Sequence, residues 1–338
     1  MGYSSQAGAV LLKTQTAKGV FPADFDATAV GLKVRSGALG ANRDLLVPDP
    51  EIGGGRDTSD AYLGAISFAG DYEFYARMES IATILGAALG NTDTTWDDVS
   101  MVGTHVFTPS DGAQLPFLSI QEQIGAGLDS FDYTDVVVNT FHLEAESNGF
   151  LMGTAGMIAM TQAPTLVPVA APEFDNTPLI VGTNITATYN GVTVPAKSFN
   201  LDINNNFEDD DFRLGSFFLG DLTPKSREIT AQLTIRHSAK DMWRQATYGT
   251  SAAVAPGGIV TKQPLVITMT TYEDIEGSTP PIKSSLSFLI PKCVISPFAY
   301  SPSGDDVLEN DLDLRGLRPV PGTSIITGTL INGLEVVA

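Results

Sequence analysis

The sequence predicts a mainly β protein. Its 338 residues include 33 Gly and 20 Pro spread along the chain, and these separate many short runs rich in Val, Ile, Thr and Phe. Short runs bounded by turn residues are typical of β-sandwiches and barrels. Only two stretches show the apolar spacing of an α-helix, so we expect each half of a largely β fold to carry one helix.

Ten runs have the composition and alternation of β-strands. They are Val30–Arg35, Tyr62–Phe68, Phe117–Gln123, Asp135–Glu146, Asn184–Tyr189, Ser198–Asn204, Glu228–His237, Leu265–Tyr272, Ser284–Ile290 and Ser324–Leu330.

The clearer helix is predicted from Asp71 to about Leu89, where apolar residues recur at helical spacing. Asp71 can cap its start and Gly90 can end it. A second, shorter helix is predicted from Ser238 to Tyr248, because its first residues resemble a capping box and a glycine follows.

The two helices occupy the same place in two halves that run in the same order, which predicts an internal duplication. The alignment pairs Leu32 with Phe199, Tyr75 with Trp243 and Ile120 with Ile267. The identity between the halves is low, so a chance match of two β-rich segments stays open.

This reading divides the chain into five parts. They are an N-terminal arm (1–28), a first β module (29–162), a Pro-rich linker (163–178), a second β module (179–322) and a C-terminal strand or tail (323–338). We expect the arm and the tail to order upon assembly.

The charge balance disfavours tight binding of nucleic acid. Nineteen Lys and Arg face 39 Asp and Glu, for a net charge of −20, the opposite of a basic phosphate-binding surface. An acidic wall would let a polyanion pass without sticking. The mean hydropathy of +0.09 indicates that apolar surface is buried between subunits, and no apolar run is long enough to predict a membrane span.

No residue pattern predicts catalysis, so we expect no enzyme activity and no cofactor. Cys293 is the only cysteine, and the histidines His105, His142 and His237 are isolated in the sequence. The run 202–211 begins like a calcium-binding EF-hand loop, but Phe207 stands at its glycine position and Arg213 at its glutamate position. A loose calcium site, a solvated acidic loop and a set of intersubunit ion pairs all remain open for this run.

One segment carries a family resemblance. His105-Val106-Phe107-Thr108-Pro109 precedes a short loop, the pair Leu115-Pro116 and a predicted strand. In this order the chain resembles the major tail tube proteins of long-tailed bacteriophages. The resemblance covers most of residues 1–160 and, through the duplication, more faintly 180–322.

The resemblance implies duplicated β-sandwich or barrel modules of the tail tube type, each flanked by one α-helix. It also implies a structural protein of the virion, made in the host bacterial cytoplasm. Rings with six copies of the fold would stack into a tube through which DNA is ejected. With two copies in each chain, a trimeric ring would have pseudo-sixfold symmetry. Other tail proteins, such as the tape measure and the terminator, would be partners. Alternatives are a secretion-system tube protein, a tail terminator and a decoration protein.

Two long loops, Gly37–Asp60 and Asn204–Arg227, occupy equivalent places in the halves and mix apolar with charged residues. Their apolar residues favour burial against another copy, so we predict that both loops contact a neighbouring subunit or ring. The residues predicted to make these contacts are Arg43, Asp44, Leu45, Leu46, Asp49, Glu51, Arg56, Asp57, Glu208, Asp209, Asp210, Asp211, Phe212, Arg213, Phe217 and Phe218.

Overall fold

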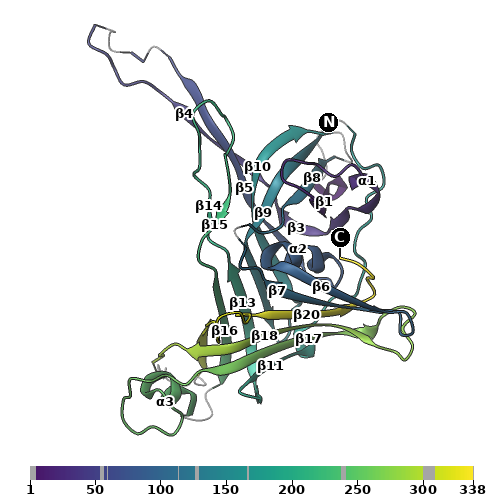
Figure 1. Cartoon of the computed structure of the whole chain (residues 1–338), viewed down its shortest axis with the longest axis vertical. Coiled ribbons are helices and arrows are strands. Elements are labelled where there is room, and N and C mark those ends of the chain that lie inside the picture. Colours follow the sequence, from purple (N-terminus) through teal and green to yellow (C-terminus); the bar gives the residue numbers. More distant parts are fainter. Residues whose placement is uncertain are drawn as a thin grey trace.

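A computed structural model describes residues 5–53, 57–58, 60–112, 114–125, 129–165, 167–236, 241–299 and 309–337. Nearly all its strands belong to one extensive, strongly bent sheet in which every strand pair is antiparallel (Figure 1). The prediction of a mainly β fold is therefore confirmed.

The strands range from two to 18 residues in length. In chain order they are β1 Ala9–Thr14, β2 Val30–Leu32, β3 Val34–Gly37, β4 Gly40–Leu46, β5 Tyr62–Tyr75, β6 Gly90–Asp97, β7 Val102–Pro109, β8 Leu118–Ile124, β9 Asp129–Glu146, β10 Met152–Pro164, β11 Ile185–Tyr189, β12 Val192–Val194, β13 Ala196–Asn204, β14 Phe207–Glu208, β15 Thr223–Pro224, β16 Glu228–Arg236, β17 Gln263–Asp274, β18 Lys283–Ile295, β19 Glu309–Gly316 and β20 Thr327–Asn332. Each of the ten predicted strands coincides at least in part with one of these.

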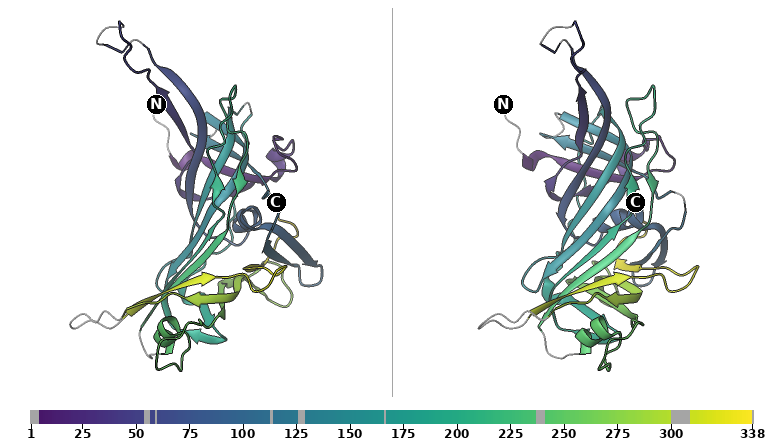
Figure 2. Two further views of the ribbon diagram at one scale, coloured as in Figure 1. Left: turned by 60° about the vertical axis from the view of Figure 1, so that its left-hand side comes forward. Right: turned by 90° about the vertical axis from the view of Figure 1, so that its left-hand side faces the viewer.

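The long strands form a continuous surface in the order β4 and β3, β5, β10, β9, β13, β16, β19 (Figure 2). We call this surface the long sheet. Along β13, β16 and β19, and along the last parts of β5 and β9, every second side chain is buried, as in Phe74 on β5, Leu143 on β9 and Leu201 on β13, while the alternate side chains face outward. The inner face packs on a single apolar core that extends across both halves of the chain.

The predicted helix from Asp71 starts too early. Residues 71–75 belong to β5, and α2 spans only Ser80–Leu89. The alternation of buried Tyr72 and Phe74 with exposed Asp71 and Glu73 is the period of a strand. Gly90, with φ 103°, ends the helix as expected.

Helix α2 starts without a local side-chain cap. The carboxylate of Asp175 instead accepts hydrogen bonds from the backbone N–H groups of Glu79 (3.1 Å) and Ser80 (2.7 Å), which supplies the capping oxygen from far along the chain. Asp175 lies in the predicted Pro-rich linker, so this segment is packed against the first half of the chain.

The second predicted helix is present as α3, Asp241–Tyr248. Its predicted first residues, 238–240, lie outside the described residues. The helix is followed by Gly249 at φ 95°, where an added Cβ would lie 2.1 Å from the carbonyl oxygen of Ile259. A short helix α1, Phe25–Thr28, lies near the N-terminus.

Both ends of the chain contribute strands to the monomer. Strand β1 pairs with β2 and β8, and its Leu11 and Leu12 are buried. Strand β20 pairs with β18 and β7. The expected N-terminal arm and C-terminal tail are thus partly built into the fold without a second copy.

The two halves show the same succession of strand pairings. In the first half β1–β8, β8–β9, β9–β10, β10–β5 and β5–β3 are paired. In the second half β11–β17, β17–β18, β18–β19, β19–β16 and β16–β13 are paired. The helices α2 and α3 follow β5 and β16. Tyr75 and Trp243, which the sequence alignment matched, do not correspond: Tyr75 ends a strand and Trp243 lies in a helix.

Candidate assembly surfaces

A long β-hairpin projects from the body of the molecule. Strand β4 pairs along the first part of β5, with Arg43 opposite Ile66, Leu45 opposite Leu63 and Leu46 opposite Tyr62. Figure 1 shows this hairpin extending well beyond the rest of the fold. From here on, the arm means this β4–β5 hairpin and not the N-terminal segment 1–28. Every residue of β4 is exposed, so the arm is held by strand pairing rather than by a core of its own.

The second predicted loop lies against the arm. The backbone N–H of Ile66 donates to the carbonyl oxygen of Phe217 at 2.8 Å. The guanidinium of Arg43 lies 5.5 Å from the centroid of the Phe217 ring, within cation–π range. The structure therefore brings together two loops that are far apart in the sequence, a contact that no local sequence pattern predicts.

Apolar side chains on these two segments are exposed. Their exposed fractions range from 37% for Phe218 to full exposure for Ile52. Such exposure is unusual for large apolar side chains gathered in one region. The exposed apolar residues are Leu45, Leu46, Val47, Ile52, Tyr62, Leu63, Phe212, Leu214, Phe217 and Phe218. The loop is nevertheless anchored, because Phe207, Leu219 and Leu222 are buried in a small apolar cluster.

Several charged residues of these loops already have partners within the chain. Arg213 pairs with Asp211 at 2.6 Å and Lys225 with Glu208 at 3.7 Å. These ions are substantially exposed, and such pairs contribute little to stability. Asp44 lies on β4, Asp49, Glu51 and Asp57 lie in the connection beyond it, and Asp209 and Asp210 follow β14. Arg56 lies outside the described residues.

A buried carboxylate fixes the base of the arm. Glu122 on β8 accepts a hydrogen bond from the backbone N–H of Leu39 at 2.9 Å, just before β4. It also accepts from the hydroxyl groups of Tyr72 and of Tyr133, the latter at 3.3 Å. Burial and the nearby Glu122 raise the pKa of Tyr72 and of Tyr133. The sequence did not single out Glu122, because its role depends on three strands meeting.

The outer face of the long sheet is acidic. Carboxylates alternate there with buried core residues, and few cations accompany them. We call this set the acidic face: Asp71, Glu73, Glu144, Asp202, Asp311 and Asp313. The Nδ1–H group of His142, on the same face, donates a hydrogen bond to the carboxylate of Asp202 at 2.6 Å, and Arg315 pairs with Glu228 at 2.9 Å.

The residues considered for chemistry lie apart. His105 bonds to Thr94 and Asn332, and burial lowers its pKa; His237 lies outside the described residues. Cys293 is buried, which raises the pKa of its thiol to about 12 and disfavours the reactive thiolate.

Across the described residues, no group of three or more His, Cys, Asp or Glu side chains is arranged to hold a metal ion. In the run 202–211, whose first residues resemble a calcium-binding loop, Asn204 and Asn205 hydrogen-bond to backbone atoms.

A family model described as phage tail tube protein matches residues 5–316. The chain belongs to this family. No curated protein matches the chain significantly. The family identifies a structural component of a phage virion, a tail tube protein that assembles with other tube subunits and tail components. No helix within the described part of this tail tube protein is long and apolar enough to cross a membrane.

Proposed function

We propose that this tail tube protein assembles with copies of itself into closed rings that stack into a tube, through which DNA is ejected into the host. The observation that carries this proposal is the arm: an exposed apolar hairpin reaching away from the body of a tail tube protein. Burial of its apolar side chains against another copy would stabilise the assembly, at roughly 25 cal/mol per Å² of apolar surface removed from water.

Each chain, in this proposal, contains two copies of one fold. The support is the shared succession of strand pairings in the two halves, together with the helix that follows β5 in one half and β16 in the other. Three chains would then close a ring with pseudo-sixfold symmetry, because a head-to-tail interface closes whenever its rotation divides the circle.

The acidic face is the candidate wall of the bore. In a ring built from the long sheets of several chains, the main apolar core occupies one side of each sheet. On the opposite side Val137, Ile158 and Met160 are covered by Phe207, Leu219 and Leu222, and the acidic part of that side is free to line the lumen. Carboxylates such as Glu144, Asp202 and Asp313 would repel the DNA phosphates, so the polyanion would slide without binding. The tube would therefore not bind DNA tightly.

The arm, with the loop 209–222 lying on it, is the candidate contact between stacked rings. Its length places apolar residues such as Leu45, Leu46 and Ile52 beyond the reach of the chain's own core. The charged residues that remain without a described ion pair, including Asp44 and Glu51, would add specificity more than affinity.

Electron microscopy of the purified full chain tests this function. We expect rings and stacked tubes of uniform width. Deletion of residues 208–218 should leave a folded chain, with unchanged circular dichroism in the β region, that forms no tubes. Dispersed monomers from the unaltered chain would contradict self-assembly, and normal tubes from the deletion variant would contradict the stacking role of the loop.

A further inference from the structure

The turn between β1 and α1 lies against the loop 209–222. The ammonium group of Lys18, in this turn, lies 2.8 Å from a carboxylate oxygen of Asp221, which follows 203 positions later in the chain. The same ammonium group lies 5.8 Å from the centroid of the Phe117 ring, within cation–π range. Phe117 belongs to the small apolar cluster that anchors the loop. The N-terminal part of the chain therefore contacts the end of a loop that belongs to the second half.

A buried carboxylate fixes this turn, residues 15–20, to the body of the molecule. Asp135 on β9 is 5% exposed, and it accepts a hydrogen bond from the backbone N–H of Gly19 at 2.6 Å. At the start of the turn, the backbone N–H of Gln15 donates to the carbonyl oxygen of Phe117 at 2.8 Å. The chain on both sides of Lys18 is therefore tied to the first half, independently of the loop 209–222.

The backbone of Asp135 has an unusual shape at this contact. The β8–β9 register shifts between Leu118 and Ile120, where Thr134 and Asp135 of β9 stand opposite Ser119 alone. Asp135 has φ 58°, a left-handed conformation that is uncommon for residues other than glycine. A bulge of this kind re-aims a side chain, and strained backbone is often retained at functional positions. The bulge therefore directs the carboxylate of Asp135 to the turn.

Asp221 connects the turn to the arm. Besides the bond from Lys18, its carboxylate accepts a hydrogen bond from the backbone N–H of Leu222 at 2.9 Å. The hydrogen bond from Lys18 holds the pKa of Asp221 below its ordinary value. Four residues earlier in the loop, the carbonyl oxygen of Phe217 accepts the hydrogen bond from the N–H of Ile66 on the arm. A short stretch of chain therefore joins the contact at Lys18 to the contact on the arm.

The other ion pairs of this loop do not fix it to the body of the molecule. Arg213 pairs with Asp211 inside the loop, and Lys225 pairs with Glu208 across its base. Among the ion pairs of the described residues, the one between Lys18 and Asp221 joins the loop to a segment outside 204–227. It is therefore the charged contact best placed to set where the loop lies.

We propose that the turn 15–20 is a clasp that sets the position of the loop 209–222 on the arm. Lys18 is the positioning residue, and Asp135 holds the turn in place. This inference rests on the proposed role of the arm and the loop in stacking, and it adds the residues that arrange them before another ring binds. A surface that is already ordered loses less conformational freedom on association, so the clasp favours stacking by acting through the loop.

Changes of charge across the pair test the clasp. In the unassembled chain, hydrogen exchange of the Ile66 amide reports on its bond to Phe217. The two side chains of the pair are 38% and 42% exposed, so we expect Lys18→Asp to speed this exchange by roughly two- to fivefold and no more. Lys18→Arg keeps the charge and should stay near the unaltered rate. Asp221→Lys should also speed exchange, and the double variant Lys18→Asp/Asp221→Lys should exchange more slowly than Asp221→Lys alone.

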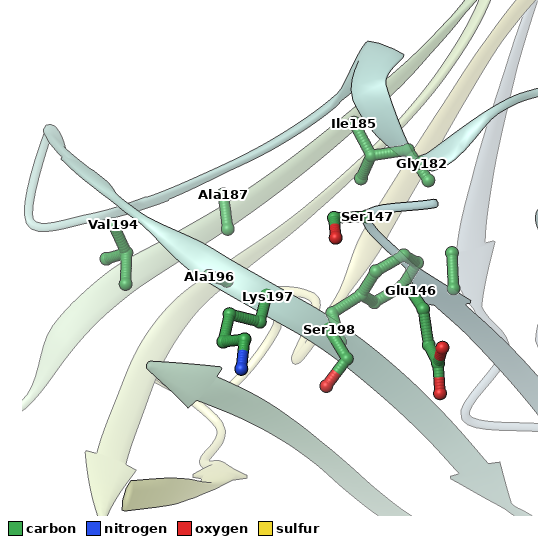
Figure 3. A pocket seen from close by; sticks show the side chains of 11 residues that line it. Glu146, Ser147, Gly182, Ile185, Ala187, Val194, Ala196, Lys197 and Ser198 are labelled. Carbon is green, nitrogen blue, oxygen red and sulfur yellow. The ribbon is translucent and has the colours of Figure 1, made fainter. Parts of the chain in front are cut away.

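Lys197→Asp is the matched control. Lys197 pairs with Glu309, and its exposed fraction of 47% is close to that of Lys18. It lies beside Ser147, just past the end of β9 (Figure 3), whereas the clasp is attached near the start of that strand. Exchange on the arm should therefore not change. If Lys18→Asp folds poorly, Lys18→Gln, which only removes the charge, should give a smaller change in the same direction.

Tube formation by the same variants, followed by light scattering, tests the effect on stacking. Lys18→Asp should form tubes more slowly than the unaltered chain at low salt, with a smaller difference at high salt, because salt screens exposed charges. Unchanged exchange at Ile66 in Lys18→Asp would overturn the clasp and leave the proposed function standing. Faster exchange with unchanged tube formation would overturn its role in stacking. An unaltered chain that forms no tubes would contradict the proposed function, while exchange at Ile66 would still test the clasp.

Discussion

The imidazole of His142 and the carboxylate of Asp202 lie 2.6 Å apart across the junction between β9 and β13. Each residue comes from a different half of the chain. Their contact therefore spans the pairing of β9 with β13 that makes the long sheet continuous.

This contact should make the stability of the chain depend on pH. The hydrogen bond to Asp202 raises the pKa of His142, with a smaller contribution from Glu144, while burial opposes the rise. Because the folded-state pKa is raised, the stabilisation is fully present below the ordinary histidine pKa of about 6.5 and is lost as pH rises through the raised value.

Urea unfolding of the unaltered chain and of His142→Gln, from pH 5 to pH 9, measures this effect. We expect the unaltered chain to be more stable at pH 5 by up to about 1 kcal/mol, since both side chains are partly exposed. The difference should shrink toward pH 9. If the free energy of unfolding changed with pH by the same amount in the two proteins, His142 and Asp202 would have no net charge interaction.

The base of the arm should depend on Glu122. Replacing Glu122 with Leu leaves the N–H of Leu39 and the hydroxyl group of Tyr72 without their shared acceptor, whereas the hydroxyl group of Tyr133 can still donate to the carbonyl oxygen of Leu39 at 2.9 Å. Each buried polar group left unsatisfied costs about 1–3 kcal/mol, so thermal unfolding should show a clear loss of stability. Glu122→Gln keeps an acceptor oxygen and should lose less. Equal losses from the two variants would argue against the hydrogen bonds as the cause.

The tip of the arm should matter for stacking but not for folding. Leu45→Ser together with Leu46→Ser removes two apolar groups that are 62% and 54% exposed in the monomer. The melting temperature should change little, because exposed positions contribute weakly to stability. The yield of tubes in sedimentation should fall at least tenfold. Val254→Ser, at another exposed apolar position on a different part of the surface, is the matched control, and tube yields equal to that control would count against the arm.

The acidic face should ease the passage of DNA. Replacing Glu144 by Gln and Asp311 and Asp313 by Asn removes three of its negative charges. We expect slower DNA ejection from particles carrying the variant, measured as release of a DNA-binding dye. Neutralising Glu273 and Glu276, which are exposed outside the acidic face, should have no such effect. Unchanged ejection from the first variant would contradict the role of the face.

Much of the fold was predictable because the strand signal is local. The alternation in Ser198–Asn204 and Glu228–Arg236 reflects burial on one face of a sheet. The same signal is present, outside the ten predicted strands, in β19, where Leu312 and Leu314 alternate with Asp311 and Asp313. Strand β6 was unpredictable on these grounds, since it is an exposed strand with few apolar residues.

The false helix start at Asp71 has a specific cause. Phe74, Met78 and Ile81 fit a helical stripe when read alone, but Phe74 belongs to the strand alternation of β5. Only the pairing of β5 with β10 and β3 shows that Phe74 follows the two-residue period of a strand and not the period of a helix.

The candidate surfaces were predictable in part. Exposed apolar residues marked both loops, yet the contact between Arg43 and Phe217 depends on how distant segments pack. The same holds for Glu122, whose partners come from separate strands, and for the acidic face, which appears only once the register of β5, β9, β13 and β19 is known.

A cryo-electron microscopy map of the assembled tube, at a resolution that traces the strands, tests the central claim most directly. We expect rings of three chains in which Glu144, Asp202 and Asp313 point into the bore and the arms cross to the adjacent ring. A map in which these carboxylates face outward, or in which each arm folds back on its own subunit, would contradict the account.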